Sequence, residues 1–187
     1  MNPQQVKQHV IEVSSELFYK NGYSGTSMNM IIQATAIQAK QLFELFESKE
    51  AICIAFLAQK NEKFLAEIDE FVSKRPVGYE RIISVFDFLE ILYDSNEFNG
   101  CWRVKTISDI PENDQLLKNS IQKHKGEFLN FLEKLIQENE PKLTAEETKT
   151  LSKQIYVLYE GAITESLSHN QKWPIATAKA LFSRILN

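Results

Sequence analysis

The sequence predicts an all-α protein of about nine helices, and three observations lead to this prediction. Apolar residues recur at helical spacing along nearly the whole chain. No segment sustains the alternation of apolar and polar residues that a half-buried strand would show. Several helical stretches end at Asn-Gly pairs or just before a proline, which are common stop signals. With 187 residues, of which 43% are hydrophobic, the chain is large enough to bury a core.

Local signals set the limits of the individual helices. Gly22 suits the left-handed residue that follows a first helix. A hydroxyl of Thr26 or Ser27 can cap a second helix by accepting its first free N–H groups. Thr144 and Glu147 form a capping box that opens a later helix. The expected ranges are about 6–21, a short segment after 27, 38–45, 48–73, 77–96, 102–110, 113–139, 144–169 and 174–186.

Composition and charge argue against several classes of protein. A net charge of −4 is unlike that of a protein that coats nucleic acid without selectivity. Cys53 and Cys101 form no CxxC pair and the three histidines are scattered, so we expect no metal and no cofactor. No apolar run approaches the roughly 18 residues that a membrane helix needs, and the N-terminus has no signal-peptide pattern. A cytoplasmic protein without a membrane segment is expected.

The predicted third helix carries side chains that suit contact with DNA. A helix in the major groove contacts bases through side chains near its N-terminus. Gln38 and Gln41 can pair with the adenine edge, and Lys40 can reach a guanine edge or a phosphate. Thr26 and Ser27 open the second helix, where a hydroxyl and free amides can bind a backbone phosphate.

Each of these features also has a simpler interpretation. Glutamines on a short helix are usually solvated surface, and Thr26 and Ser48 cap helices whether or not DNA is near. Lys49 adds a positive charge at the start of the fourth helix. The arrangement as a whole, rather than any single side chain, favours a helix-turn-helix.

A series of residues between positions 17 and 50 has the spacing of a known DNA-binding head: Leu17-Phe18, Gly22-Tyr23, Thr26-Ser27, Ile31, Ala34, Ile37, Leu42-Phe43, Phe46 and Ser48-Lys49-Glu50. Through them, residues 6–56 resemble the N-terminal domain of the TetR family of transcription regulators without a gap. The resemblance implies a helix-turn-helix DNA-binding domain over residues 1–47 and a helical regulatory, ligand-binding and dimerisation domain over residues 48–187. It implies DNA contacts by Thr26, Ser27, Gln38, Ala39, Lys40, Gln41, Phe43 and Lys49.

Three positions depart from the family pattern. Ala36 replaces the usual glycine before the reading helix, although glycine adopts a positive φ most easily. Phe43 replaces the usual tyrosine, and Leu45 replaces the usual histidine. Residues 1–60 contain five lysines, five glutamates and no arginine, so this segment is formally neutral apart from His9. A neutral head should bind DNA less tightly and with a shallower salt dependence than a basic one.

The resemblance also implies a homodimer built from the last two long helices. Gly161 and Ala162 would let two backbones approach closely, although the simpler alternative is that Gly161 packs within one subunit. Two reading helices about 34–36 Å apart would require a palindromic operator in double-stranded DNA. The residues expected at the dimer interface are Leu151, Ile155, Leu158, Gly161, Ala162, Ala178, Leu181 and Phe182.

Many aromatic residues lie in the second domain and could line a cavity for an apolar ligand, although most aromatic stripes at helical spacing are simply core. We expect such a pocket between the fifth and eighth helices. Cys101 could sense oxidants or electrophiles, but an inert thiol is the simpler interpretation. The residues expected at the ligand site are Phe86, Leu89, Trp102, Thr106, Phe128, Tyr156 and Tyr159.

The resulting hypothesis is a ligand-responsive transcriptional repressor that a small apolar molecule releases from its operator. One alternative is a helical small-molecule-binding or scaffold protein that has lost DNA recognition. An enzyme is not expected, because no paired-carboxylate, metal-spaced or nucleophile–base constellation stands out. The effector, the operator sequence, the regulated genes and the choice between repressor and activator are left open by the sequence.

Overall fold

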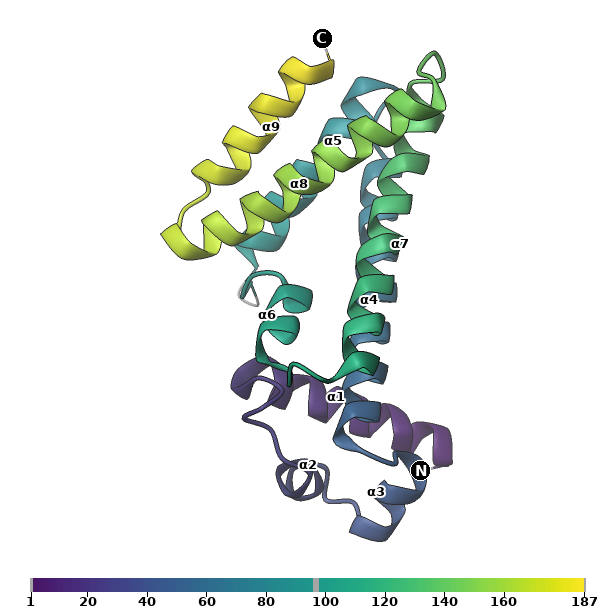
Figure 1. The fold of residues 1–187 in the computed structure, drawn as a ribbon, viewed down its shortest axis with the longest axis vertical. Helices are drawn as coiled ribbons and strands as arrows, with labels where there is room; N and C mark the ends of the chain where they lie inside the picture. The colour runs from purple at the N-terminus through teal and green to yellow at the C-terminus, as the bar shows by residue number, and fades with distance from the viewer. Residues whose placement is uncertain (1, 96–97, 187) are drawn as a thin grey trace. The chain divides into compact units, whose positions relative to one another are not determined.

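The computed structural model describes residues 2–95 and 98–186, and its regular structure over these residues is entirely helical (Figure 1). The predicted all-α class is therefore confirmed for this part of the chain, as are its nine helices. They are α1 (Pro3–Asn21), α2 (Met28–Thr35), α3 (Ala39–Leu45), α4 (Lys49–Ser73), α5 (Tyr79–Asp94), α6 (Trp102–Asp109), α7 (Gln115–Asn139), α8 (Ala145–His169) and α9 (Trp173–Leu186).

The predicted stop and start signals account for most helix limits. Ser27, rather than Thr26, caps α2, because its hydroxyl accepts a hydrogen bond from the backbone N of Met30 at 3.2 Å. The capping box predicted for α8 is present. α5 begins two residues later than predicted, because Gly78 precedes it with φ 99°, a backbone that a helix cannot include. The predicted end of that helix at Asn96 lies outside the described residues.

The chain folds into two compact units, and the first contains the described residues up to Glu62 together with Trp102–His124. It holds α1, α2, α3, the first half of α4, α6 and the start of α7. The predicted boundary after residue 47 falls just before α4 and stays a prediction about domains; in the compact unit the start of α4 and α6 join the head. Its core contains Val6, Val10, Phe18, Ile31, Leu42, Phe46, Ile52, Leu57, Leu117 and Ile121.

The second unit contains Lys63–Cys101 and the chain from Lys125 onward. Within it α9 packs against both α8 and α5, and α5 also packs against α8 (Figure 1). α4 and α7 are continuous helices whose residues are divided between the two units. The core of the second unit is aromatic and aliphatic, and includes Ile68, Ile82, Phe86, Leu89, Phe128, Leu132, Ile155, Tyr159 and Phe182.

Candidate nucleic-acid interface and regulatory site

The turn between α2 and α3 depends on Ala36, which has a left-handed backbone with φ 54° and ψ 24°. At the end of α2 the Thr35 hydroxyl donates to the carbonyl oxygen of Ile31 at 2.7 Å. Gln38 follows as the N-cap of α3, and its side chain makes no capping hydrogen bond. The left-handed residue reverses the chain in few residues, so α3 starts directly after α2. The turn therefore forms although alanine replaces the glycine usual in the family.

α3 is exposed on most of its surface and is anchored at few points. Leu42 is fully buried, and Phe46 just beyond the helix is buried as well. The side chains of Gln38, Ala39, Lys40, Gln41, Phe43 and Glu44 are all exposed, and Phe43 is 51% exposed. The predicted reading side chains thus lie together on the outside of the first unit. Their contact with DNA stays a prediction.

Two residues predicted to contact DNA make hydrogen bonds inside the first unit. Thr26 is only 1% exposed, and its hydroxyl donates to the carbonyl oxygen of Gly22 at 2.7 Å. Lys49 Nζ donates to the carbonyl oxygens of Tyr23 and Thr26 at 2.8 and 2.9 Å, and lies 4.1 Å from the centre of the Tyr23 ring. These side chains therefore hold the connection between α1 and α2, and the contact of both with DNA stays a prediction. Ser27 remains exposed beside them.

Partial burial explains the titration behaviour around this connection. Burial lowers the pKa of Lys49, because the charged ammonium is partly removed from water. Neighbouring acidic groups act in the opposite direction and raise this pKa. Burial also raises the pKa of Tyr23 to about 12, and the charge of Asp114 adds to the effect. The buried Cys53 thiol has a pKa of about 12 for the same reason. Its thiolate is therefore scarce at neutral pH.

Asp109, at the end of α6, fastens α6 to the connection between α1 and α2. Its Oδ2 accepts from the backbone N of Ser24 at 2.9 Å, and its carbonyl oxygen accepts from the Ser24 hydroxyl at 2.5 Å. Gly22 has φ 76°, and a Cβ on it would collide with the Asp109 carboxylate. Lys105 Nζ also donates to the carbonyl oxygen of Tyr19 at 3.3 Å. α6 is thus tied to the head.

Asp109 is not among the residues predicted from the sequence. One signal could have found it, because a carboxylate in the last turn of a helix opposes the helix dipole and needs a compensating partner. The spacing of 85 residues between Asp109 and Ser24 gives no local clue to that partner.

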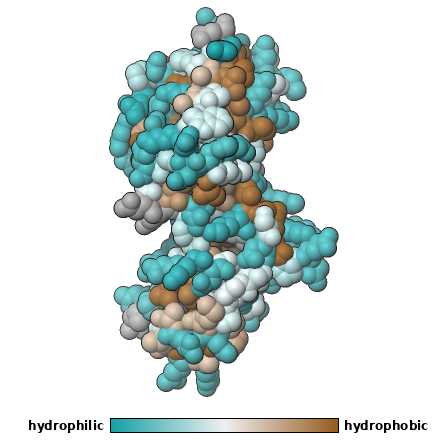
Figure 2. Space-filling model, turned by 90° about the vertical axis from the view of Figure 1, so that its left-hand side faces the viewer, coloured by the Kyte–Doolittle hydropathy of each residue, from teal (hydrophilic) through white to brown (hydrophobic). Residues whose placement is uncertain are grey.

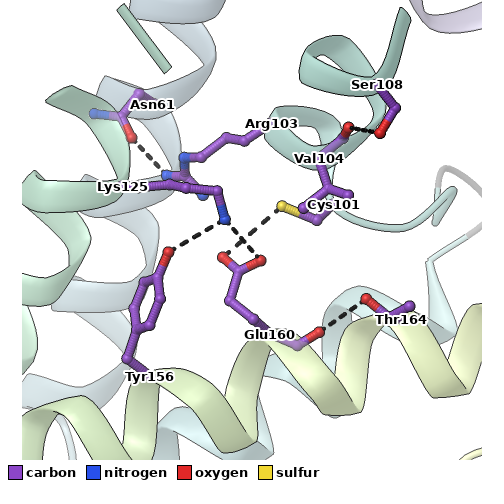
Figure 3. A network of polar contacts seen from close by, with 9 residues as sticks. All are labelled: Asn61, Cys101, Arg103, Val104, Ser108, Lys125, Tyr156, Glu160 and Thr164. Carbon is purple, nitrogen blue, oxygen red and sulfur yellow. Dashed lines mark hydrogen bonds and ion pairs between the residues drawn. The ribbon is translucent and has the colours of Figure 1, made fainter. Parts of the chain in front are cut away.

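A small pocket in the first unit has room for about 20 Å³, enough for one water molecule. Two residues of the predicted ligand site, Trp102 and Thr106, line it. Beside Trp102, Arg103 is buried, and its Nη2 donates to Asn61 Oδ1 at 2.5 Å (Figure 3). The other residues of the pocket wall are Phe18, Tyr19, Gly22, Tyr23, Cys53, Phe56 and Lys105.

The other predicted ligand residues belong to the second unit. Phe86, Leu89, Phe128 and Tyr159 are buried in its core, where the rings of Phe128 and Tyr159 meet edge to face at 5.1 Å between centroids. Tyr156 is only half-buried. The predicted ligand set is therefore divided between the two units, and four of its members fill a packed core. For these four residues the structure agrees with the simpler interpretation that side chains at helical spacing form the core.

A cluster of polar side chains lies in the second unit beside these aromatic residues (Figure 3). Lys125 Nζ on α7 is 3.1 Å from Glu160 Oε2 on α8 and donates to the Tyr156 hydroxyl at 3.2 Å. The Cys101 thiol points to Glu160 Oε1 at 3.9 Å. Glu160 therefore faces the cluster. Cys101 has an acidic neighbour that the sequence did not reveal.

Burial and charge act against each other in this cluster. Burial is the largest single effect and lowers the pKa of Lys125, but the charges of Glu160 and Cys101 and the hydrogen bonds to Tyr156 and Glu160 together outweigh it, so the net pKa is raised. Burial raises the pKa of Tyr156, and Glu160 adds to that rise. At neutral pH the ammonium of Lys125 therefore stays charged and the Tyr156 phenol stays protonated. The cluster offers one cation, one carboxylate and one hydroxyl for binding.

Five residues of the predicted dimer interface lie in the core of the second unit. Leu151, Ile155, Ala162, Ala178 and Phe182 are buried there, and their contact with a second subunit stays a prediction. The reason for their burial is that the larger apolar faces of α8 and α9 pack on each other and on α5.

Three of the predicted interface residues remain available in part. Gly161 and Leu181 are exposed, and Leu158 is half-buried. Around them lie further exposed apolar side chains that the sequence analysis missed, including Val157 at 68% exposed and Ile185 at 46%. Figure 2 shows hydrophobic side chains, in brown, gathered on this unit near the end of α9. The free apolar surface is thus the opposite face of the same two helices.

Two absences hold for the described part of the chain. Over residues 2–95 and 98–186 no three His, Cys, Asp or Glu side chains are grouped as metal ligands would be. No helix within the same ranges is long and apolar enough to cross a membrane.

Comparison with known proteins agrees with this geometry. Residues 10–56 match the family of bacterial regulatory proteins named after TetR. An uncharacterized HTH-type transcriptional regulator in the lacX 3′ region of Lactococcus lactis subsp. lactis is 36% identical over 56 residues, which are 30% of this chain and 29% of that protein. The HTH-type transcriptional regulator UidR of Escherichia coli K12 is 33% identical over 67 residues, which are 36% and 34% of the two chains. The matches thus span about a third of these relatives.

Solved structures resemble the chain over nearly its whole length. The reduced form of NemR from E. coli superposes with a TM-score of 0.84 at 17% identity, covering 98% of this chain and 97% of that one. A TetR transcriptional regulator from Legionella pneumophila gives a TM-score of 0.78 at 21% identity, covering 97% of each. At this identity the likeness concerns the fold. Fold and head together define a helix-turn-helix protein with a helical second part. Residues 10–56 match the N-terminal domain of the TetR family of regulatory proteins, and the chain as a whole shares the fold of solved TetR-type regulators.

Proposed function

We propose that the protein is a DNA-binding transcriptional regulator that acts as a ligand-responsive repressor in the cytoplasm. The observation that carries the proposal is the short, exposed α3, held by the left-handed Ala36 turn within the segment that matches the family. Exposed Gln38, Lys40 and Gln41 on this helix are suited to base edges in the major groove. No enzymatic role is proposed.

The test is selection of bound fragments from a random duplex pool, followed by a mobility-shift titration with the selected duplex. The variant Gln38→Ala/Gln41→Ala should lose at least 10-fold in discrimination between selected and random duplexes, because each bidentate pair contributes about 1–3 kcal/mol. Gln59→Ala is the matched control, since this exposed glutamine lies on α4. Unchanged selectivity of the double variant would contradict the assignment. Selection that enriches no sequence would favour the helical binding or scaffold protein, which the formally neutral head suggests.

We further propose that the protein acts as a homodimer through the exposed faces of α8 and α9. Val157, Gly161, Leu181 and Ile185 are the residues that support this proposal, because they leave apolar or small surface uncovered on the second unit. A symmetric dimer would present two α3 helices to successive major grooves and would need a palindromic operator.

Sedimentation velocity tests the dimer. Leu181→Glu places a charge in the proposed interface and should shift the protein from dimer to monomer at micromolar concentration. Leu116→Glu changes an equally apolar residue, 60% exposed on α7, and should leave the mass unchanged. A dimeric Leu181→Glu variant, or a wild-type monomer, would refute this interface.

For the effector we propose a site in the second unit beside the Lys125, Tyr156 and Glu160 cluster. Ligand sites commonly combine apolar walls with a few convergent polar groups, and this cluster adjoins Phe128, whose ring lies 6.0 Å from that of Tyr156. A small, largely apolar molecule with one polar group fits this chemistry.

An effector should prefer the state that does not bind DNA. A thermal-shift screen of small metabolites, followed by mobility shifts with each stabilising compound, tests the response. At least one compound should release the selected duplex, and its effect on melting should shrink in Tyr156→Phe. Stabilising compounds that leave DNA affinity unchanged would oppose the effector proposal.

A further inference from the structure

We propose that α3 selects A·T base pairs, with Gln38 and Gln41 reading adenine and the Ala39–Phe43 face contacting thymine methyl groups. This inference rests on the proposed function, because it assumes that α3 lies in the major groove. It specifies the chemistry of the operator, which the family assignment leaves open.

The exposed ring of Phe43 is the first observation. Leu42 and Phe46 already anchor α3 in the core, whereas Phe43 is 51% exposed and is not part of that core. A half-exposed phenylalanine gains little from folding and leaves apolar surface in water. On a reading helix such a ring has a matching partner, since thymine is the base that presents a methyl group in the major groove.

Ala39 extends this apolar surface toward the start of the helix. Residues four apart lie on the same side of a helix, so Ala39 and Phe43 form one stripe. Both are exposed. A methyl group and a ring one turn apart can contact the thymines of neighbouring base pairs.

The two glutamines form a second stripe next to the first. Gln38 and Gln41 are three residues apart and both are exposed. The amide of Gln38 makes no hydrogen bond that caps α3. A glutamine amide can donate to adenine N7 and accept from adenine N6, so it pairs with adenine bidentately. Since adenine pairs with thymine, the amide stripe and the apolar stripe favour the same base pair.

Guanine has few suitable partners on this head. The commonest guanine contact is a bidentate arginine, and residues 1–60 contain no arginine. Lys40 is the single lysine of α3, and the carboxylate of Glu44 lies one turn further along the same side. That carboxylate reduces the positive charge that Lys40 can offer to a guanine edge or a phosphate. Both the side chains present and those missing therefore favour A·T pairs.

Selection from a random duplex pool gives the first test. The full-length protein should enrich half-sites in which A·T pairs occupy the positions of strongest preference. A G·C-rich palindrome would overturn this inference and leave the proposed DNA-binding function intact. The absence of any enriched sequence would overturn both.

Atomic substitutions in the selected duplex give the second test. Replacing the preferred thymines by deoxyuridine removes one methyl group each and should weaken binding about 4-fold per contacted methyl. Phe43→Ala should bind more weakly and lose most of this sensitivity, whereas Leu116→Ala on α7 should keep it. Replacing adenine by 7-deazaadenine should weaken wild-type binding at least 5-fold and the Gln38→Ala/Gln41→Ala variant much less. Equal sensitivity of wild type and variants to these substitutions would overturn the assignment.

Discussion

Replacing Ala36 by glycine is expected to stabilise the protein. Ala36 has φ 54° and ψ 24°, and its side chain is exposed, so removing its methyl group loses little packing. A residue with a Cβ loses about 1–2 kcal/mol in this backbone region. Glycine avoids that cost but loses about 0.5–1 kcal/mol more conformational entropy on folding. The balance is a gain of about 0.5–1 kcal/mol in the free energy of unfolding.

Urea unfolding followed by circular dichroism measures this gain. With a slope of about 2 kcal/mol per molar urea, the midpoint should rise by about 0.3–0.5 M. Ala58→Gly is the matched control, because Ala58 is also exposed but lies inside α4, where glycine costs about 1 kcal/mol. The two substitutions should therefore shift the midpoint in opposite directions. If Ala36→Gly destabilises the protein as much as Ala58→Gly does, the left-handed turn is refuted.

Three further predictions concern stability. Gly22→Ala should destabilise the protein by about 2 kcal/mol or more in urea unfolding, because φ is 76° and the new Cβ meets the Asp109 carboxylate; an unchanged midpoint would contradict the contact. The pKa of Cys53 in the folded protein is raised from 9.0 to about 12. The contribution of this thiol to the free energy of unfolding is therefore fully present below pH 9 and is lost as the pH rises toward 12. At alkaline pH the Cys53→Ala variant should therefore lose about 4 kcal/mol less of its free energy of unfolding than the wild type does. An equal dependence of the free energy of unfolding on pH in the two proteins would refute the raised pKa of Cys53. Lys125→Met leaves the partly buried Glu160 carboxylate without its cation and should cost about 1–3 kcal/mol, whereas adding Glu160→Gln should restore part of the loss in thermal melting.

Much of the fold could be predicted from the sequence, because helix formation depends on residues close together in the chain. The caps at Ser27 and Thr144 and the stop before Gly22 are local signals, and each is confirmed. The left-handed backbone at Ala36 agrees with the position of the glycine usual in the family. The exposure of the predicted reading side chains on α3 also follows from a short helix with one fully buried residue, Leu42.

The site beyond α3 could be predicted only in part. Lys49 has the residue type of a phosphate ligand, but its hydrogen bonds reach carbonyl oxygens 26 and 23 residues earlier in the chain. The pairing of Lys125 with Glu160 likewise joins α7 to α8. No pattern of local spacing contains such partners.

The sequence by itself determined the helices, their ends and the side chains that α3 offers to a partner. The tertiary structure alone decided which apolar face is core and which is free. On α8 and α9 both faces carry apolar residues, and packing on α5 buries Ile155 and Phe182 while Val157 and Leu181 stay uncovered. The physical reason is that periodicity records only the direction of a side chain around its own helix. Burial and charge pairing depend on what another part of the chain places opposite it.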